Sequence, residues 1–157
     1  MRILGIDPGT GIMGFGVIET GGRHPQMLDA GVIRTEVNQP EPERLVTIYD
    51  SLRQIIDETK PNVVSVEKLF FARNVTTAMN VAQARGVVLL AAQQFKLPIY
   101  EYTPLQIKMS LVGYGRATKS QVQEMVRVVL KLKQAPKPDD CADALAAALT
   151  HQMSVKF

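Results

Sequence analysis

Residues 1–35 read MRILGIDPGTGIMGFGVIETGGRHPQMLDAGVIRT, and this stretch decides the class of fold that the chain can adopt. It holds three short apolar segments whose length and Ile and Val content predict β-strands: residues 1–7, 14–19 and 30–35. The pair Pro8-Gly9 follows the first segment, and Gly21-Gly22 follows the second. Because such pairs mark tight turns, the stretch predicts an antiparallel meander of three strands.

After residue 35 the chain alternates between helical and strand patterns. Apolar residues from Leu45 to Ile56 recur at helical spacing, and Pro61 ends that helix. The next predicted elements are a strand at 63–66, a helix from 76 or 77 to 95, a strand at 98–102, short helices after Thr103 and Thr118, and a helix at 139–151. Three strands followed by this alternation predict one α/β domain over residues 1–157, with helices on the faces of a mixed sheet.

The composition is typical of one folded domain. The chain has 157 residues, of which 46% are hydrophobic and 21% are charged, so it can form a core and disorder is not the default. A single cysteine, Cys141, excludes an intrachain disulfide and a cysteine-based metal cluster. No apolar run reaches the ~18 residues of a membrane span, and the N-terminus lacks a signal-peptide pattern. We therefore expect a soluble, cytoplasmic protein with no membrane partner.

The charge is distributed unevenly along the chain. Residues 1–60 carry 6 basic and 9 acidic side chains, whereas residues 61–157 carry 12 basic and 6 acidic ones. A basic half suits a polyanionic partner such as nucleic acid, although many ordinary domains share this balance.

The long helix predicted from residue 76 or 77 to 95 is rich in alanine and also contains Gly86. Small side chains allow a second helix to approach closely. Two interpretations stay open at this point, which are tight packing within the chain and a dimer interface.

Four acidic residues lie at places that are typical of a functional site. Asp7 ends the first predicted strand and Glu67 follows the strand at 63–66. Asp140 and Asp143 lie three residues apart at the start of the last helix, and therefore on one helix face. Ligands of open α/β sheets gather just beyond strand ends. Each acid also has a structural interpretation, such as capping a turn, favouring a helix N-terminus or pairing with a nearby lysine or arginine.

Together, the four acids favour a metal site. Four like charges that converge in a partly buried place repel one another, so they require a cation. A ligand set of oxygens alone suits Mg²⁺ or Mn²⁺. Two such ions held ~4 Å apart activate a water and stabilise the leaving oxygen of a phosphodiester.

Several separate motifs resemble the RuvC family of Holliday-junction resolvases. They are LGIDPGT and GVI near the start, VSVEKLFFARN at 64–74, AQARG at 82–86, KSQVQEMV at 119–126, and DDCADALAAALTH at 139–151. The similarity runs from residue 1 to about residue 152. The resemblance implies a ribonuclease H-like fold with a mixed five-stranded sheet and helices on both faces.

By this resemblance, Asp7, Glu67, Asp140 and Asp143 occupy the positions of the family's four catalytic, metal-binding acids. The spacing of the family's last motif selects Asp140 over its neighbour Asp139. The implied reaction is hydrolysis of a phosphodiester by a metal-activated water, which leaves a 5′-phosphate and a 3′-hydroxyl. The implied cofactor is Mg²⁺, with two ions per active site and Mn²⁺ as a substitute.

The DNA-binding residues implied by the resemblance and by local chemistry are Phe70, Arg73, Asn74, Lys108, Arg116 and Lys119. Phe70 matches the family's aromatic residue that inserts at the junction, and Phe71 suits the core better. The loop at 113–119 combines glycines, two cations and a helix N-terminus, which favours phosphate binding in any family. Glu101 could be a further acid near the site, and Arg85 has no assigned role.

The implied partners are four-way junction DNA, a second copy of the chain and the RuvA–RuvB branch-migration complex, in the bacterial cytoplasm. A roughly two-fold junction needs two active sites, and a symmetric homodimer supplies them. The alternatives are a related ribonuclease H-like nuclease acting on other DNA or RNA, an actin-like or sugar-kinase ATPase, and a DNA-binding module without activity. The ATPases need two such domains, and a binding module has no need of four convergent carboxylates.

Overall fold

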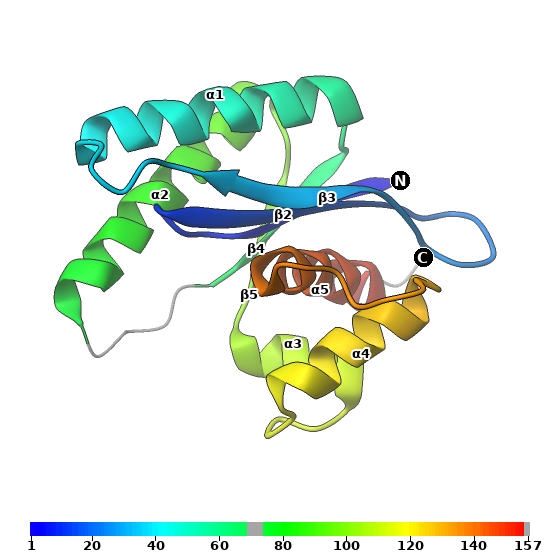
Figure 1. Ribbon diagram of the computed structural model, residues 1–157. Coiled ribbons are helices and arrows are strands. Elements are labelled where there is room, and N and C mark those ends of the chain that lie inside the picture. Colours follow the sequence, from blue (N-terminus) through cyan, green and yellow to red (C-terminus); the bar gives the residue numbers. More distant parts are fainter. Residues whose placement is uncertain (69–73, 156–157) are drawn as a thin grey trace.

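The computed structural model describes residues 1–68 and 74–155. Figure 1 shows a central sheet with helices packed on it. The strands are β1 (Arg2–Asp7), β2 (Ile12–Glu19), β3 (Gln26–Arg34), β4 (Val63–Glu67) and β5 (Ile99–Tyr102). The helices are α1 (Glu41–Thr59), α2 (Val75–Gln94), α3 (Pro104–Val112), α4 (Lys119–Val129) and α5 (Asp139–Ser154).

The sheet is mixed, with the strand order β3-β2-β1-β4-β5. The first three strands pair in antiparallel fashion as the predicted meander, whereas β4 is parallel to β1 and β5 is parallel to β4. Helices α1 and α2 are the connections that carry the chain into β4 and β5. This arrangement confirms the five-stranded, mixed α/β sheet expected for a ribonuclease H-like fold.

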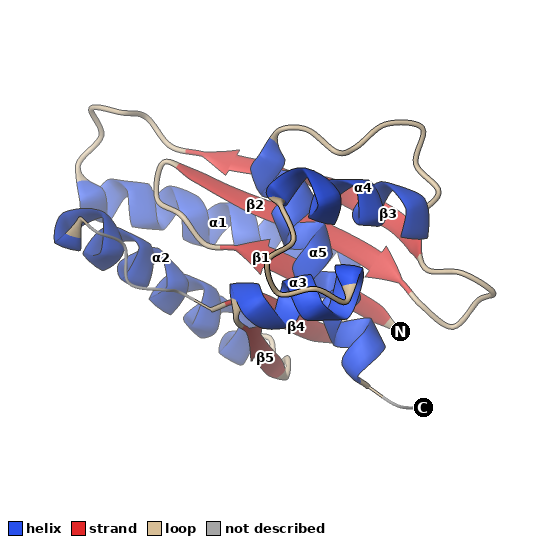
Figure 2. Cartoon of the chain, turned by 90° about the horizontal axis from the view of Figure 1, so that it is seen from below, coloured by secondary structure: helices blue, strands red, loops and turns tan. Residues whose placement is uncertain are grey.

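Helices cover both faces of the sheet, and each face has its own hydrophobic core. Figure 1 shows α1 on one side of the sheet and α3, α4 and α5 on the other. Figure 2, which views the molecule from below, shows α3, α4 and α5 in front of the strands. Alternate residues of one strand serve the two cores: in β1, Ile3 packs with α5, while Leu4 packs with α1 and α2.

Helix α5 forms the centre of one core. Leu145 and Leu149 are fully buried, and so are the alanines between them. Ser65 of β4 is also fully buried, and its hydroxyl donates a 2.7 Å hydrogen bond to the Ala147 carbonyl. This bond joins α5 to the middle of the sheet. It satisfies a buried hydroxyl that would otherwise cost about 1–3 kcal/mol.

The predicted helix starts at Thr103 and Thr118 are confirmed. Each threonine side chain accepts a hydrogen bond from the backbone three residues later, and Gln106 and Gln121 complete the two capping boxes. Both caps lie beside the predicted site, because α3 and α4 carry Lys108 and Lys119.

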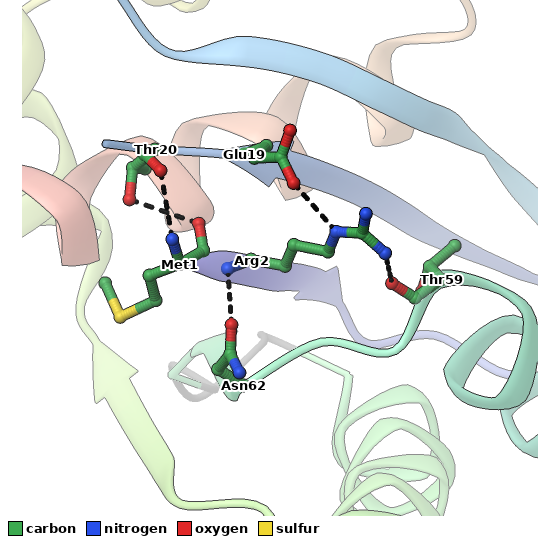
Figure 3. A network of polar contacts seen from close by, with 6 residues as sticks. All are labelled: Met1, Arg2, Glu19, Thr20, Thr59 and Asn62. Atoms are coloured by element: carbon green, nitrogen blue, oxygen red, sulfur yellow. Dashed lines mark hydrogen bonds and ion pairs between the residues drawn. The ribbon is translucent and has the colours of Figure 1, made fainter. Parts of the chain in front are cut away.

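A polar network fixes the N-terminal end of β1 (Figure 3). The Met1 amine donates to the Thr20 carbonyl at 2.9 Å, and the Arg2 guanidinium contacts both Glu19 and the Thr59 carbonyl. The Arg2 backbone N–H also donates to Asn62 at 2.7 Å. These bonds tie β1 to β2 and to the chain entering β4. They therefore fix the strand whose other end carries Asp7.

Helix α2 is long and apolar enough to cross a membrane if length and composition alone are considered. Polar residues and Arg85 interrupt the helix, so it passes this test on mean hydropathy without a continuous apolar run of ~18 residues. One face of α2, including Ala84, Val88 and Ala91, is buried in the core shared with α1. The opposite face is exposed.

Candidate active site

Two of the four predicted acids lie at the ends of neighbouring parallel strands. Asp7 ends β1 and Glu67 ends β4, and the preceding residues Ile6 and Val66 are partners in the β1–β4 register. Ile6 and Val66 point into the core beneath α1 and α2. By alternation, Asp7 and Glu67 point to the other face, where α5 lies.

The other two acids approach from α5. Asp140 and Asp143 lie in its first turns, three residues apart and on one face. After burial, the charges of Glu67, Asp143 and Asp140 contribute to raising the pKa of Asp7, so these three carboxylates lie within electrostatic range of it. Asp7, Glu67, Asp140 and Asp143 thus lie at the strand ends and helix start from which the site was predicted, and their assignment as one metal site stays a prediction.

The cluster is strongly perturbed by burial and by like charge. Desolvation, followed by the charges of Glu67 and Asp143 and a hydrogen bond with Glu67, raises the pKa of Asp7 to about 9. Desolvation, followed by the charge of Asp143, also raises the pKa of Glu67. Burial is likewise the main cause that raises the pKa of Asp143. At neutral pH, one proton or one cation has to offset this charge.

Two lysines border the carboxylates in a cleft of about 240 Å³. The cleft is lined by Glu67, Pro104, Ile107, Lys108, Lys119, Val122, Asp143 and Ala146. The Lys119 ammonium lies 3.1 Å from Asp143 and 3.9 Å from Asp139. The cleft thus combines anionic and cationic groups with an apolar floor, and it is open to solvent on the side of the lysines.

The donor set fits hard divalent cations. All four carboxylates supply oxygen, which Mg²⁺ and Mn²⁺ prefer, and their mutual repulsion favours a cation among them. Within residues 1–68 and 74–155, no three acidic, cysteine or histidine side chains stand in a closed set of metal ligands. Instead, the Lys119 ammonium contacts Asp143 and offsets part of the repulsion.

The other predicted site residues divide into three groups. Lys108 and Lys119 line the cleft, and Arg116 is exposed in the loop between α3 and α4. The Asn74 side chain caps α2 by accepting from the N–H groups of Thr76 and Thr77 at 3.0 and 3.4 Å. Phe70, Phe71 and Arg73 lie outside the described residues. The roles of all these residues in DNA binding stay predictions.

Glu101 is not a further acid of the cluster. Its carboxylate pairs with Arg85 of α2, on the face of β5 that lies away from α5. Tyr102, on the α5 face, instead hydrogen-bonds to Nδ1 of His151 at 2.8 Å. The strand IYEY is too short and too mixed in polarity for its two faces to be told apart from sequence.

Cys141 and His151 are both buried in α5, as a structural role requires. Burial raises the pKa of the Cys141 thiol to about 11, which keeps it protonated and unreactive at neutral pH. Sequence reasoning missed the structural role of Ser65, whose hydroxyl joins β4 to α5. The available signal was a lone hydroxyl within the apolar run VVSV.

Known proteins are similar to this chain over nearly its whole length. The profile of the family described as "Crossover junction endodeoxyribonuclease RuvC" matches residues 3–151. The chain is 57% identical over 157 residues to a crossover junction endodeoxyribonuclease RuvC of Desulfitobacterium hafniense, covering 100% of this chain and 95% of that protein. It is 52% identical over 151 residues to the protein of that name from Brevibacillus brevis, covering 96% and 91%.

Among solved structures, a Thermus thermophilus RuvC in complex with Holliday junction substrate superposes with a TM-score of 0.93. It shares 40% sequence identity and covers 98% of this chain and 93% of that one. The family match at residues 3–151 includes all four acidic positions. The chain therefore belongs to the RuvC family of crossover junction endodeoxyribonucleases.

Proposed function

We propose that this chain resolves four-way DNA junctions by paired, symmetric hydrolysis of phosphodiester bonds. The observation that carries the proposal is the grouping of Asp7, Glu67, Asp140 and Asp143 at the ends of β1, β4 and α5 in a RuvC-family protein. Membership makes the chain an endodeoxyribonuclease. The acidic cluster is where the reaction takes place.

Asp7, Glu67, Asp140 and Asp143 would hold two Mg²⁺ ions, for which Mn²⁺ can substitute. When bound, these ions activate water and neutralise the charge that builds on the phosphate. The chain's own residues hold the ligand oxygens at fixed positions, because Asp7 and Glu67 lie on adjacent parallel strands. Asp140 and Asp143 lie on a helix that is bonded to the same sheet through Ser65.

Lys108 and Lys119 would hold the phosphate backbone beside the acids. Both border the cleft that contains Glu67 and Asp143, so a phosphate drawn to the lysines also meets the carboxylates. Arg116, Arg73 and Asn74 would contact the strands outside the cleft, and Phe70 would stack on bases at the junction. Such an arrangement couples distortion of the junction to cutting.

The functional unit would be a homodimer that pairs through α2. The exposed face of α2 carries Val75, Met79, Ala82, Gly86 and Leu90, which are small or apolar and recur at helical spacing. Val75 is 70% exposed and Met79 is 58% exposed. A two-fold axis at this face would supply one active site for each of the two opposed strands. The RuvA–RuvB complex would act with this dimer in the bacterial cytoplasm.

The decisive experiment is a cleavage assay on a synthetic four-way junction, beside a linear duplex of the same sequence, with Mg²⁺ or with EDTA. We expect paired, ligatable nicks in the junction alone and in Mg²⁺ alone. Cutting of the duplex or of an RNA–DNA hybrid would instead assign the same acids to a related nuclease. Binding without cutting in Mg²⁺, and also when Mn²⁺ replaces it, would contradict the catalytic proposal.

A further inference from the structure

Helix α5 lies directly against the backbone of β1 and β2, because glycines face it. A Cβ atom at Gly5 would lie 1.9 Å from the carbonyl oxygen of Ala144. A Cβ atom at Gly14 would lie 1.9 Å from the carbonyl oxygen of Asp140. Contacts below 3.0 Å do not occur for real Cβ atoms, so any side chain at these two positions would displace the helix.

Gly14 is placed between two of the four acids. It is the cross-strand partner of Asp7 in the β1–β2 register. Its Cβ position would also meet the carbonyl carbon and the Cβ atom of Asp140, at 2.4 and 3.1 Å. The obstructing atoms are backbone and the base of the Asp140 side chain, which cannot move aside by a change of rotamer.

We propose that Gly14 is a positioning residue that sets the separation between Asp7 and Asp140, and through it the affinity of the metal site. This inference rests on the proposed function. A methyl group at Gly14 would have to move the Asp140 backbone from 1.9 Å to at least 3.0 Å away. Mg²⁺ demands ligand distances near 2.0–2.1 Å, so a displacement of about 1 Å exceeds what the site tolerates.

The displacement would be concentrated at the first turn of α5. The middle of the helix is held by the Ser65 bond to Ala147 and by burial of Leu145 and Leu149. A methyl group at Gly14 therefore tilts the N-terminal turn away from β2, while the body of the helix stays in place. The chain would keep its fold and lose the alignment of its ligands.

Two other glycines provide matched controls. Gly16 lies two residues along the same strand, and its Cβ position meets the Leu145 side chain at 2.5 Å. Gly16→Ala therefore strains the packing of α5 through a side chain in the core and leaves Asp140 alone. Gly11 lies in the turn before β2, with nothing within 4 Å of its Cβ position.

The experiment titrates Mn²⁺ into the wild-type protein and into Gly14→Ala, Gly16→Ala and Gly11→Ala by isothermal calorimetry, and records thermal unfolding in EDTA. We expect Gly14→Ala to weaken Mn²⁺ binding by about 10–100-fold, the range seen when the residues supporting a ligand are lost. Gly11→Ala should bind as the wild type does. Gly16→Ala should lower the melting temperature at least as much as Gly14→Ala, with Mn²⁺ affinity close to wild type.

Junction affinity measured in EDTA shows whether a variant keeps its folded DNA-binding surface when the metal site is altered. This affinity should be the same in Gly14→Ala as in the wild type. Equal Mn²⁺ affinity in wild type and Gly14→Ala, or equal losses in Gly14→Ala and Gly16→Ala, would overturn the inference. A wild-type protein that cuts no junction and binds no Mn²⁺ would overturn the proposed function as well.

If Gly14→Ala fails to fold, Ser65→Ala replaces it, because this change removes a bond that holds α5 on the sheet without adding an atom. It should weaken Mn²⁺ binding more than Thr150→Val, which removes a buried hydroxyl bonded within α5 itself. Equal Mn²⁺ affinities in these two variants would overturn the inference.

Discussion

The Lys119 ammonium lies 3.1 Å from the Asp143 carboxylate, which joins the start of α4 to the start of α5. Partial burial lowers the pKa of Lys119, but the contact with Asp143 outweighs it and raises that pKa overall. The lysine is therefore charged at neutral pH. It lies where a bound cation and a DNA phosphate would both act.

Replacement of Lys119 should change metal binding and cleavage in opposite directions. Lys119→Met removes a charge that competes for Asp143, so Mn²⁺ should bind up to about fivefold more tightly, as an ion pair worth up to ~1 kcal/mol implies. Cleavage should nevertheless fall, because the proposed contact of Lys119 with a DNA phosphate would be lost. Calorimetry measures the Mn²⁺ affinity, and a junction assay measures cleavage. Weaker Mn²⁺ binding together with reduced cleavage would contradict the proposed role of Lys119.

Removal of any one acid should separate cutting from binding. Asp7→Asn, Glu67→Gln, Asp140→Asn and Asp143→Asn should each abolish cleavage and retain junction binding in a gel-shift assay, since the phosphate contacts remain. Asp139→Asn is the control, because the Asp139 side chain is 60% exposed and Asp139 is not one of the four proposed metal ligands. Loss of binding in all four variants would argue against a role confined to the metal.

Asp7→Asn should also stabilise the metal-free protein. Burial and the charges of Glu67 and Asp143 disfavour the Asp7 carboxylate, and an amide of the same shape carries no such cost. A gain of 1 kcal/mol raises the melting temperature by about 2–4 °C in a domain of this size. Calorimetric scans in EDTA measure it, and a lower melting temperature than wild type would contradict the electrostatic account.

The adjacent aromatics should differ in their effect on cutting. Phe70→Ala should impair junction cleavage more than Phe71→Ala, because loss of a stacked base costs ~1–3 kcal/mol. The comparison requires variants of equal thermal stability. If Phe71→Ala alone were inactive in cleavage, Phe71 and not Phe70 would be the residue that stacks on the bases.

A charge on the exposed face of α2 should separate the protomers. Met79→Glu introduces a carboxylate into the proposed interface and should yield a monomer in sedimentation equilibrium. Val46→Glu is a close control, because Val46 of α1 has the same 58% exposure as Met79. A dimer that survives Met79→Glu would place the interface elsewhere.

His151 should contribute to loss of stability in acid. Burial lowers the pKa of His151, so the unfolded chain binds this proton more readily than the folded one. The contribution is complete above about pH 6.5, the ordinary histidine value, and is lost as the pH falls from there through the lowered folded pKa. His151→Gln should flatten the dependence of the unfolding free energy on pH between pH 7 and 5, measured by urea denaturation.

The sequence predicted the features that depend on local chemistry. The two threonine caps, the strand ends at Asp7 and Glu67, and the helix beginning at Asp139 all appear in the structure. Strand β3 begins at Gln26, four residues earlier than the expected residue 30. Its first residues, Gln26 to Asp29, are exposed at the edge of the sheet and show no alternation of apolar and polar side chains.

Features that depend on distances between elements could not be predicted. The pairing of Glu101 with Arg85 depends on which face of a four-residue strand meets α2. The approach of α5 to Gly14 depends on how closely a helix lies on a sheet, and the spacing of residues along the chain does not encode that distance.

Helix α5 is the last element in the described part of the chain, and it carries half of the proposed ligands together with the centre of one core. A polypeptide whose synthesis stops before residue 139 contains Asp7 and Glu67 but neither Asp140 nor Asp143. It also leaves the α5 face of the sheet uncovered. An unfinished product would thus be unable to cut DNA and open to proteolysis, so nuclease activity would arise only after translation has passed the point at which the domain can fold.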